Sequence, residues 1–410
     1  EIALRLVGSE MCIRDSLRVL KERLGPKCLV TASTGTAAEK INAGTLHSAL
    51  CLGFGKESVE TILARCRRRG ISSALKALII DEVSMLTGTL LDKVFDVLKT
   101  LTFGNGMPQL VLCGDPMQLG AVALEREGPF YASSAMKNLV KPYVLTENFR
   151  QDDSSHFTRI LNRSRIGRAS QIDVLWLQSN ARQPTELGDA NSDVTRLYCK
   201  CHSVAAYNDV RYAQIANPEV VYEASTMSGA APVPYVPDKQ IKLKVDARVM
   251  LTRNSQENGR LFNGCMGTVK MCAPDYVKVQ FDNGILYCVR RAWTDHTYRP
   301  INTKAPPDAP MQFPLVVAFA VTVHKSQGAT LCSVFVNLQG AFAAGQAYVA
   351  LSRVRNIEDM ELVGLDLKKL NHVNRDALRY YMHVREVSEA CMEERAEKDI
   401  AFSNPVSFWD

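Results

Sequence analysis

The chain has 410 residues, of which 46% are hydrophobic and 22% are charged, a composition typical of globular domains. This length favours two to four domains, and no stretch approaches the 18 consecutive apolar residues of a membrane span. The net charge of +6 permits a polyanionic partner without requiring one. The 12 cysteines include no Cys-x-x-Cys pair, and the nearest approach, Cys199-Lys-Cys201-His202, lacks a second ligand pair, which argues against a zinc module.

The N-terminal segment predicts a strand and then a helix. Ile2 to Val7 reads as a strand with a turn at Gly8, and a helix with leucines at 17, 20 and 24 ends at Gly25-Pro26. Here a magnesium-dependent nucleoside triphosphatase needs a phosphate loop, whose glycines let backbone amides cradle phosphates and whose lysine balances their charge. No such loop is present, because Ile13-Arg14-Asp15 stands where Gly-Lys-Ser/Thr belongs. Since residues 10–16 resemble a translated cloning linker, we expect residues 1–16 to be an anomalous segment that replaces the loop of a longer gene product.

Small and hydroxyl-bearing residues follow the next predicted strand, Cys28 to Ala32. The turn Thr31–Ala38 includes Thr34 and Gly35, and Thr45-Leu-His47-Ser48 lies about ten residues beyond it. Such residues can donate hydrogen bonds to a phosphodiester backbone. A capped turn and a structural histidine explain the same pattern. The basic stretches Arg65–Arg69 and Arg163–Arg168 likewise fit either a polyanion contact or a solvated helix face.

Two apolar runs end in polar residues. Ala77-Leu-Ile-Ile leads into Asp81-Glu82, and Gln109-Leu-Val-Leu-Cys leads into Gly114-Asp115, with Gln118 just beyond. Such runs suit strands of a parallel sheet that are buried on both faces, and ligands bind at the carboxyl ends of these strands. There one carboxylate can hold Mg²⁺, its neighbour can polarise water, and a glutamine can sense a γ-phosphate. An acidic turn after a strand is the alternative interpretation.

The second half predicts a different mixture of elements. Helical patterns around 157–177 precede strands from Val194 onward, and Asn-Gly turns separate short β runs between 241 and 291, as in a small antiparallel barrel. A proline-rich linker is expected at 300–314, and Val316–Val323 reads as one buried strand that ends in His324-Lys-Ser-Gln-Gly328. Gly345-Gln346 then opens Ala347–Arg355, and a helix of mixed charge spans 374–397.

Taken in order, these motifs resemble the PIF-type (petite integration frequency) DNA helicases of superfamily 1B, relatives of the RecD helicases. The resemblance extends from about Ser16 to Asp366 and rests on the following segments: Thr31–Ala38 with Thr45–Ser48, Asp81–Met85, Gly114–Leu119, Phe149–Gln151, Asn263–Val269, His324–Thr330 and Tyr348–Arg355. The segment Phe103–Gln109 is also similar. Two departures are the missing phosphate-loop lysine and Gly120-Ala-Val where the family has Pro-Pro-Val.

The resemblance implies an α/β fold with two RecA-like P-loop NTPase domains that have parallel sheets, and an SH3-like β-barrel insertion in the second. Domain 1A would span 17–148 with a short 1B insertion near 50–70, and domain 2A would span 149–255 and 315–370. The insertion 2B and its linker would occupy 256–314, and a helical tail would occupy 371–410.

The resemblance also implies an ATP-dependent 5′→3′ DNA helicase that translocates on single-stranded DNA. Asp81 would hold Mg²⁺, Glu82 would activate water, Gln118 would report the γ-phosphate, and Arg150 and Arg353 would be arginine fingers. The nucleotide would also contact Gly114, Asp115, Gly328 and Gln346. The residues facing DNA, or relaying closure of the two domains, would be Thr34, Gly35, Thr45, His47, His324, Lys325 and Gln327.

Partners implied by the resemblance are ATP, Mg²⁺, single-stranded DNA and a DNA fork or duplex, for a monomer in the nucleus or mitochondrion. The expected roles are DNA repair, recombination and the maintenance of telomere or organelle DNA. Because the phosphate loop is absent, an alternative stays open: a single-stranded-DNA-binding fragment or pseudo-motor without ATPase activity. A P-loop kinase of small molecules is a weaker alternative, because it would not need the His-Lys-Ser-Gln-Gly segment.

Overall fold

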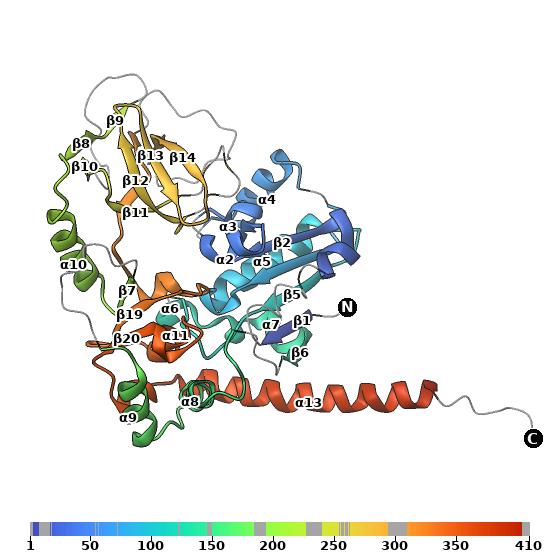
Figure 1. Cartoon of the computed structure of the whole chain (residues 1–410). Helices are drawn as coiled ribbons and strands as arrows, with labels where there is room; N and C mark the ends of the chain where they lie inside the picture. The colour runs from blue at the N-terminus through green and yellow to red at the C-terminus, as the bar shows by residue number, and fades with distance from the viewer. Residues whose placement is uncertain are drawn as a thin grey trace, which may run out of the picture.

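The structure is a computed structural model, and two parallel sheets organise it (Figure 1). An antiparallel β unit and a long C-terminal helix complete the arrangement. The residues that the structure describes are 3–7, 17, 19–53, 55, 57–71, 73–121, 124–145, 150–183, 194–226, 240–253, 255, 258, 261, 263–293 and 310–403. Only the backbone is described at 3–7, 26, 39, 40, 124, 125, 137–140, 226, 293, 310 and 391–403. Of the expected anomalous segment 1–16, residues 3–7 belong to this set, and residues 1, 2 and 8–16 lie outside it.

The first sheet has six parallel strands in the order β3-β2-β4-β5-β1-β6. Their bounds are β1 Ala3–Val7, β2 Cys28–Ala32, β3 Gly44–Thr45, β4 Ala77–Asp81, β5 Gln109–Cys113 and β6 Val140–Val144. The four apolar residues of β4 are fully buried, which confirms the prediction of a strand covered on both faces. The carboxyl ends of β4 and β5 are neighbours, so their polar residues lie at one edge.

Helices cover this sheet. The α-helices are α2 Gly35–Lys40, α3 Leu46–Ala49, α4 Val59–Arg68, α5 Gly88–Leu101, α6 Leu124–Glu127 and α7 Ser134–Leu139. The 3₁₀ turns are η1 Gly25–Lys27, η2 Val83–Met85 and η3 Phe130–Ala132. The longest, α5, is capped by Thr87, whose side chain accepts a hydrogen bond from the Leu90 amide. Its face of Leu91, Val94 and Leu98 is buried, because apolar residues recur there at helical spacing.

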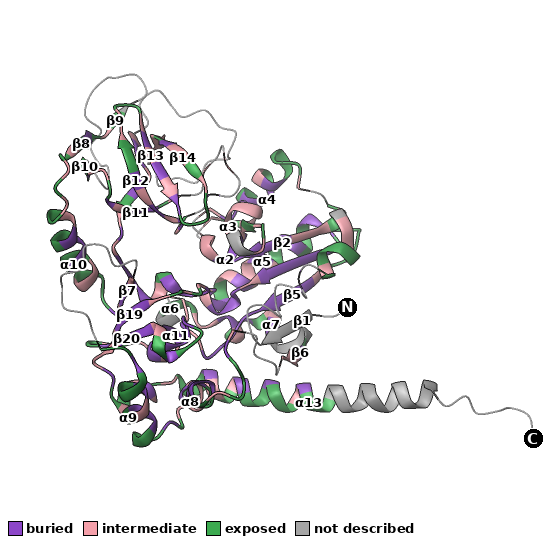
Figure 2. Ribbon diagram, viewed as in Figure 1, coloured by how far each residue is buried: buried purple, intermediate pink, exposed green. Residues whose placement is uncertain are grey.

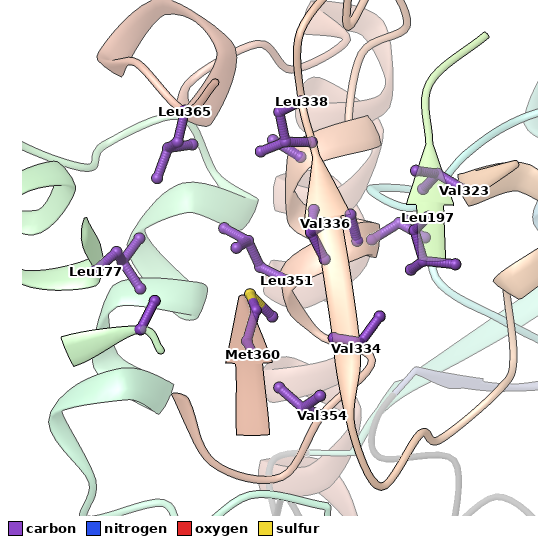
Figure 3. Close-up of a cluster of buried hydrophobic side chains, with 14 of the residues drawn as sticks. Leu177, Leu197, Val323, Val334, Val336, Leu338, Leu351, Val354, Met360 and Leu365 are labelled. Carbon is purple, nitrogen blue, oxygen red and sulfur yellow. The ribbon is translucent and has the colours of Figure 1, made fainter. Parts of the chain in front are cut away.

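The second sheet has four parallel strands in the order β18-β7-β19-β20. They span β7 Thr195–Tyr198, β18 Ala320–Thr322, β19 Val334–Asn337 and β20 Met360–Val363. The surrounding elements are α8 His156–Arg165, α9 Gln171–Asn180, α10 Cys201–Ala213, η4 Val323–Ser326, α11 Gln346–Leu351, η5 Ile357–Asp359 and α12 Leu367–Leu370. Figure 3 shows the hydrophobic core around the second sheet. Val334 and Val336 of β19 lie at its centre, with Leu197 on one side and Leu351 on the other.

Along the chain, an antiparallel unit is inserted between strands β7 and β18 of the second sheet. Its five-stranded sheet has the order β14-β13-β12-β11-β17, from β11 Arg248–Leu251, β12 Met266–Cys272, β13 Tyr276–Phe281, β14 Leu286–Arg290 and β17 Leu315–Val317. Two smaller sheets comprise β8 Val220–Glu223 with β10 Gln240–Leu243, and β9 Ser225–Thr226 with β15 Ala292–Trp293 and β16 Pro310–Gln312. The Asn-Gly turn at 283–284 joins β13 to β14, as predicted. The five-stranded sheet extends beyond the expected 256–314 segment on both sides, and closure of an SH3-like barrel stays a prediction.

The apolar run Val316–Val323 is not one strand, contrary to the prediction. Its first part belongs to β17, which pairs antiparallel with β11, and its second part forms β18 of the parallel sheet. The side chain of Asn208 on α10 holds the crossing point, because Nδ2 donates to the carbonyls of Val317 and Ala320 while Oδ1 accepts from the Ala320 amide. The chain therefore changes sheets inside a continuous apolar run.

The C-terminal helix α13, Arg375–Ser403, follows the second sheet but packs against β6 of the first (Figure 1). The Val144 amide donates to Ser388 Oγ at 2.9 Å, and the rings of Tyr380 and Tyr131 stack with centroids 4.6 Å apart. Residues coloured as exposed are frequent on α9 and on the described part of α13 (Figure 2). Within the described part of the chain, no helix is both long and apolar enough to cross a bilayer.

Candidate nucleotide and nucleic-acid site

The acidic pair occupies the end of β4. Asp81 is its last residue, and its Oδ1 accepts a hydrogen bond from the Glu82 amide at 2.9 Å. Glu82 is buried, with 6% of its surface exposed, and adopts a left-handed backbone conformation with φ of 54°. This conformation costs a non-glycine residue about 1–3 kcal/mol and is concentrated at functional sites. The turn therefore holds Glu82 in a fixed and strained position.

Neighbouring strands support this turn. From the end of β2, the Ser33 amide donates to the Asp81 carbonyl at 3.0 Å, and Ser33 Oγ donates to the Glu82 carbonyl at 2.7 Å. From the end of β5, Gly114 approaches so closely that a Cβ there would lie 2.9 Å from the Val83 amide nitrogen. The hydroxyl-rich turn and the Gly-Asp turn thus flank the acidic pair, as the parallel order of β2, β4 and β5 requires.

Gln327 reaches the acidic pair from the second half of the chain. Its Nε2 donates to Glu82 Oε2 at 3.2 Å and to Ser84 Oγ at 3.1 Å, and its side chain is 3% exposed. Its Oε1 is buried without a hydrogen-bond partner among the described residues. The sequence places Gln327 with the DNA-facing or relaying residues, and the structure brings it onto the carboxylate expected to activate water.

Asp115 follows β5 and forms an ion pair with Arg165 of α8. Arg165 Nε and Nη2 donate to its two carboxylate oxygens at 2.9 and 2.8 Å, and the Met117 amide donates to Oδ1 at 2.9 Å. The Gln118 amide donates to the Asp115 carbonyl at 3.2 Å, which closes the turn. Gln118 Oε1 is buried and has no partner among the described residues. Asp115 therefore shapes the turn that presents Gln118.

The two candidate finger arginines meet at Ser352. Arg150 Nη1 donates to the Ser352 carbonyl at 2.9 Å. Arg353 is completely buried, and its guanidinium donates to the carbonyls of Val349 and Ala329 at 2.7 and 3.1 Å and to Ser352 Oγ at 2.8 Å. Arg353 thus ties α11 to the turn after η4.

Tyr348 of α11 lies among these charged groups, and the sequence did not identify it. Burial, together with the carboxylate of Asp115, raises the pKa of Tyr348 to about 12, although Arg165, Arg353 and Arg150 act in the opposite direction. The charges of three guanidinium groups therefore act on one phenol, which stays protonated at neutral pH.

The remaining residues that were expected to contact nucleotide, Gln346 and Gly328, stabilise or form turns in this structure. Gln346 is buried, its Oε1 accepts from the amides of Phe342 and Ala343, and its Nε2 donates to the Cys199 carbonyl at 3.3 Å. Gly328 lies in the turn after η4 with φ of 78°. Their expected contact with nucleotide stays a prediction.

The candidate DNA residues lie in two groups, and the first follows strand β2 of the first sheet. Thr34 Oγ1 accepts from the Ala37 amide at 3.3 Å, and Thr45 Oγ1 accepts from the Ser48 amide at 3.3 Å, so both cap short helices. Burial lowers the pKa of His47, while Glu57 opposes the shift. Gly35 contacts the antiparallel unit, because a Cβ there would lie 2.6 Å from the Asn263 carbonyl oxygen.

The second group lies on η4. Lys325 is exposed, and His324 stacks on Phe342 with ring centroids 6.2 Å apart and 25° between the planes. Burial lowers the pKa of His324, which favours the neutral ring. Phe342 is 60% exposed, so its ring is accessible beside His324. The sequence offered no signal for choosing this aromatic residue over the others.

Comparison with known proteins agrees with this arrangement. Residues 12–183 match the family model of PIF1-like helicase. The chain is 32% identical over 379 residues to "ATP-dependent DNA helicase PIF1" of Danio rerio, an alignment that covers 87% of this chain and 57% of the relative. It is also 32% identical over 362 residues to the Homo sapiens protein of the same name, with coverage of 82% and 54%. The chain thus spans little more than half the length of these curated relatives.

A solved structure shows the same fold. The crystal structure of Pif1 helicase from Candida albicans aligns with a TM-score of 0.78 and 28% identity, covering 93% of this chain and 96% of that chain. The two parallel sheets therefore correspond to RecA-like domains, as predicted from the motifs. The ordered motifs, the fold and the relatives lead to one conclusion: this chain belongs to the PIF1-like helicase family.

Proposed function

We propose that this chain is an ATP-dependent DNA helicase in which hydrolysis at the end of β4 drives 5′→3′ translocation on single-stranded DNA. The hydrogen bond from Gln327 to Glu82 carries the proposal, because it connects the carboxylate at the first sheet directly to the His324–Gly328 segment of the second. A motor needs such a connection between hydrolysis and relative movement of its domains. The names of the relatives support ATP as the fuel and DNA as the substrate.

The chain's own residues have distinct roles in this proposal. Glu82 orients and activates the attacking water, Gln118 reports the γ-phosphate, and Arg150 and Arg353 balance its charge after local rearrangement. Gly114, Gly328 and Gln346 shape the turns around the nucleotide. The hard oxygen of Asp81 fits Mg²⁺, and Gln118 Oε1, which has no partner among the described residues, fits a site completed by a ligand. When bound, Mg²⁺ would supply charge neutralisation at the β- and γ-phosphates.

The DNA-facing residues would be Thr34, Gly35, Thr45, His47, His324 and Lys325, with Phe342 as a base-stacking platform. Contacts of this kind follow the phosphate backbone and weaken with added salt. The proposed partners are single-stranded DNA and a fork or duplex, bound by a monomer that acts in genome maintenance in the nucleus or mitochondrion. Domain limits are proposed as 1A at 17–148 with 1B near 50–70, 2A at 149–255 and 315–370, 2B within 256–314, and a tail from 371.

A second candidate function rests on one sequence observation. Ile13-Arg14-Asp15 does not provide a phosphate-loop lysine, so the chain would bind single-stranded DNA without hydrolysing ATP. The two candidates give opposite results in one experiment.

The test measures ATP hydrolysis by the chain with and without single-stranded DNA, together with DNA affinity by fluorescence anisotropy. A DNA-stimulated ATPase that Glu82→Gln reduces by roughly 10²–10⁴-fold, with DNA affinity retained, supports the helicase. DNA binding without hydrolysis supports the non-hydrolysing alternative. Full hydrolysis by Glu82→Gln would refute the role of Glu82.

A further inference from the structure

The Asp115–Arg165 ion pair joins the two halves of the chain beside Gln118. Asp115 lies in the turn after β5 of the first sheet, and Arg165 is the last residue of α8, which packs in the core of the second. The side chains are 9% and 14% exposed, and the bond is bidentate. A buried ion pair is weak grounds for stability, because desolvation offsets the attraction between the charges. The importance of this ion pair therefore lies in how it orients the Asp115 carboxylate.

Arg165 is itself held in place. The ring of Tyr381 on α13 covers its guanidinium at 4.2 Å, a cation–π contact. The same helix reaches the first half, where Ser388 accepts from the Val144 amide. Burial lowers the pKa of Arg165, but the charge and hydrogen bonds of Asp115, together with Tyr348 and Tyr381, outweigh this effect and raise the pKa, so this buried guanidinium stays charged.

The turn that Arg165 holds leads directly to Gln118. Asp115 Oδ1 accepts from the Met117 amide, so the bidentate bond fixes the orientation of a carboxylate that also caps the turn. Gly345, at the start of α11, approaches the same turn, because a Cβ there would lie 2.6 Å from the Met117 carbonyl oxygen. Two elements of the second half thus set the backbone on either side of Met117, one residue before the proposed sensor.

We propose that Arg165 is a positioning residue that sets Gln118 through Asp115, so that the γ-phosphate sensor responds to the arrangement of the two sheets. This inference rests on the proposed function of Gln118. When the second half moves, Arg165 moves with α8 and carries the carboxylate that caps the sensor turn. Arg165 then transmits relative domain position to the nucleotide without touching it.

Arg163 provides a matched control on the same helix. It also forms a bidentate ion pair, with Asp173 of α9, but that pair lies within the second half. A merely structural role for Arg165 predicts similar effects of removing either arginine. A positioning role predicts a loss of turnover for Arg165 alone.

The experiment compares DNA-stimulated ATPase of the full chain with that of Arg165→Lys, Arg165→Met and Arg163→Met, each with its Tm. Because misplacement of a catalytic group slows the chemical step, Arg165→Met is expected to lower kcat roughly ten- to a hundredfold with little change in the KM for ATP. Arg165→Lys keeps the positive charge but cannot donate two parallel hydrogen bonds to the Asp115 carboxylate. Its kcat should therefore also fall, while its Tm stays close to that of the wild type. Arg163→Met should keep its kcat.

A double-mutant cycle with Gln118→Ala separates positioning from stability. If Arg165 acts through Gln118, Arg165→Met lowers kcat no further in the Gln118→Ala background. Hydrogen exchange provides a second measurement that needs no hydrolysis: the amides of Met117 and Gln118 should exchange faster in Arg165→Met and unchanged in Arg163→Met.

The outcomes are distinguishable. Wild-type kcat in Arg165→Lys and Arg165→Met, or an additive loss in the Gln118→Ala background, overturns this inference and leaves the helicase proposal standing. A wild-type chain without DNA-stimulated ATPase overturns the helicase proposal, and the inference with it.

Discussion

The Nε2 group of Gln327 donates a hydrogen bond to Oε2 of Glu82 across a sequence separation of 245 residues. The bond is buried, and the same amide group also reaches Ser84. Movement of η4 relative to the first sheet would break it and change the environment of the carboxylate. The contact therefore makes the state of Glu82 depend on the second sheet.

Gln327→Ala is expected to uncouple hydrolysis from DNA. The variant leaves Glu82 without this donor, so DNA-stimulated ATPase should fall by roughly tenfold or more, in line with the effect of one misplaced catalytic group. Single-stranded DNA affinity should change much less. Steady-state ATPase across a DNA titration measures both quantities, with Gln171→Ala on the exposed start of α9 as the control. Unchanged DNA stimulation in Gln327→Ala would show that the Gln327–Glu82 hydrogen bond does not couple hydrolysis to DNA.

Phe342→Ala is expected to weaken binding of single-stranded DNA by about 1–3 kcal/mol, the usual contribution of one stacked base. The reason is that Phe342 is largely exposed and already stacks on His324, beside the exposed charge of Lys325. Fluorescence anisotropy with a labelled oligonucleotide measures the change. Ile172→Ala removes a comparably exposed apolar side chain from α9 and should have no effect. Equal affinities of both variants and the wild type would exclude Phe342 from the DNA site.

Arg353→Ala is expected to destabilise the fold by about 3 kcal/mol or more, because it leaves several buried oxygen acceptors without their charged donor. The completely buried guanidinium connects α11 to the turn after η4. Urea denaturation followed by circular dichroism gives the free energy of unfolding. Arg355→Ala, which removes an exposed arginine two residues away, should stay within about 0.5 kcal/mol of the wild type. A stable Arg353→Ala that has lost only ATPase activity would point to a finger role alone.

Gly35→Ala is expected to cost about 1–3 kcal/mol, because its Cβ would overlap the Asn263 carbonyl oxygen at 2.6 Å and force the two turns apart. Gly44→Ala is the matched control, since its Cβ meets nothing within 4 Å. Differential scanning calorimetry compares the two variants. A Gly35→Ala protein as stable as Gly44→Ala would show that close packing of Gly35 on Asn263 does not contribute to the free energy of unfolding.

Local pattern predicted the strands of the first sheet well. Four fully buried apolar residues in β4 leave a clear signal, because a strand covered on both faces needs every side chain to be apolar. The run Val316–Val323 failed for the same reason: two short buried strands of different sheets look like one long strand when no polar residue separates them. The Asn208 side chain that holds the crossing lies more than a hundred residues away.

The sequence locates the strand ends that carry the candidate residues, but it does not reveal the contacts between those residues. The acidic pair and the Gly-Asp turn follow from strand ends, which periodicity locates. The ion pair between Asp115 and Arg165 has no local signature, because Arg165 lies in a basic stretch that equally suggests a solvated helix face. Phe342 was not selected for a similar reason, since its exposure depends on the packing around η4.

Helix α13 also acts as a cover for an otherwise open sheet edge. β6 is the outermost strand of the first sheet on its side, and an uncovered edge strand recruits strands of other molecules. The chain supplies this cover from more than 200 residues downstream, where Ser388 binds the Val144 amide. A fragment cut after β6 would retain every strand of that sheet and still expose the edge, so the first half on its own should aggregate when expressed in isolation.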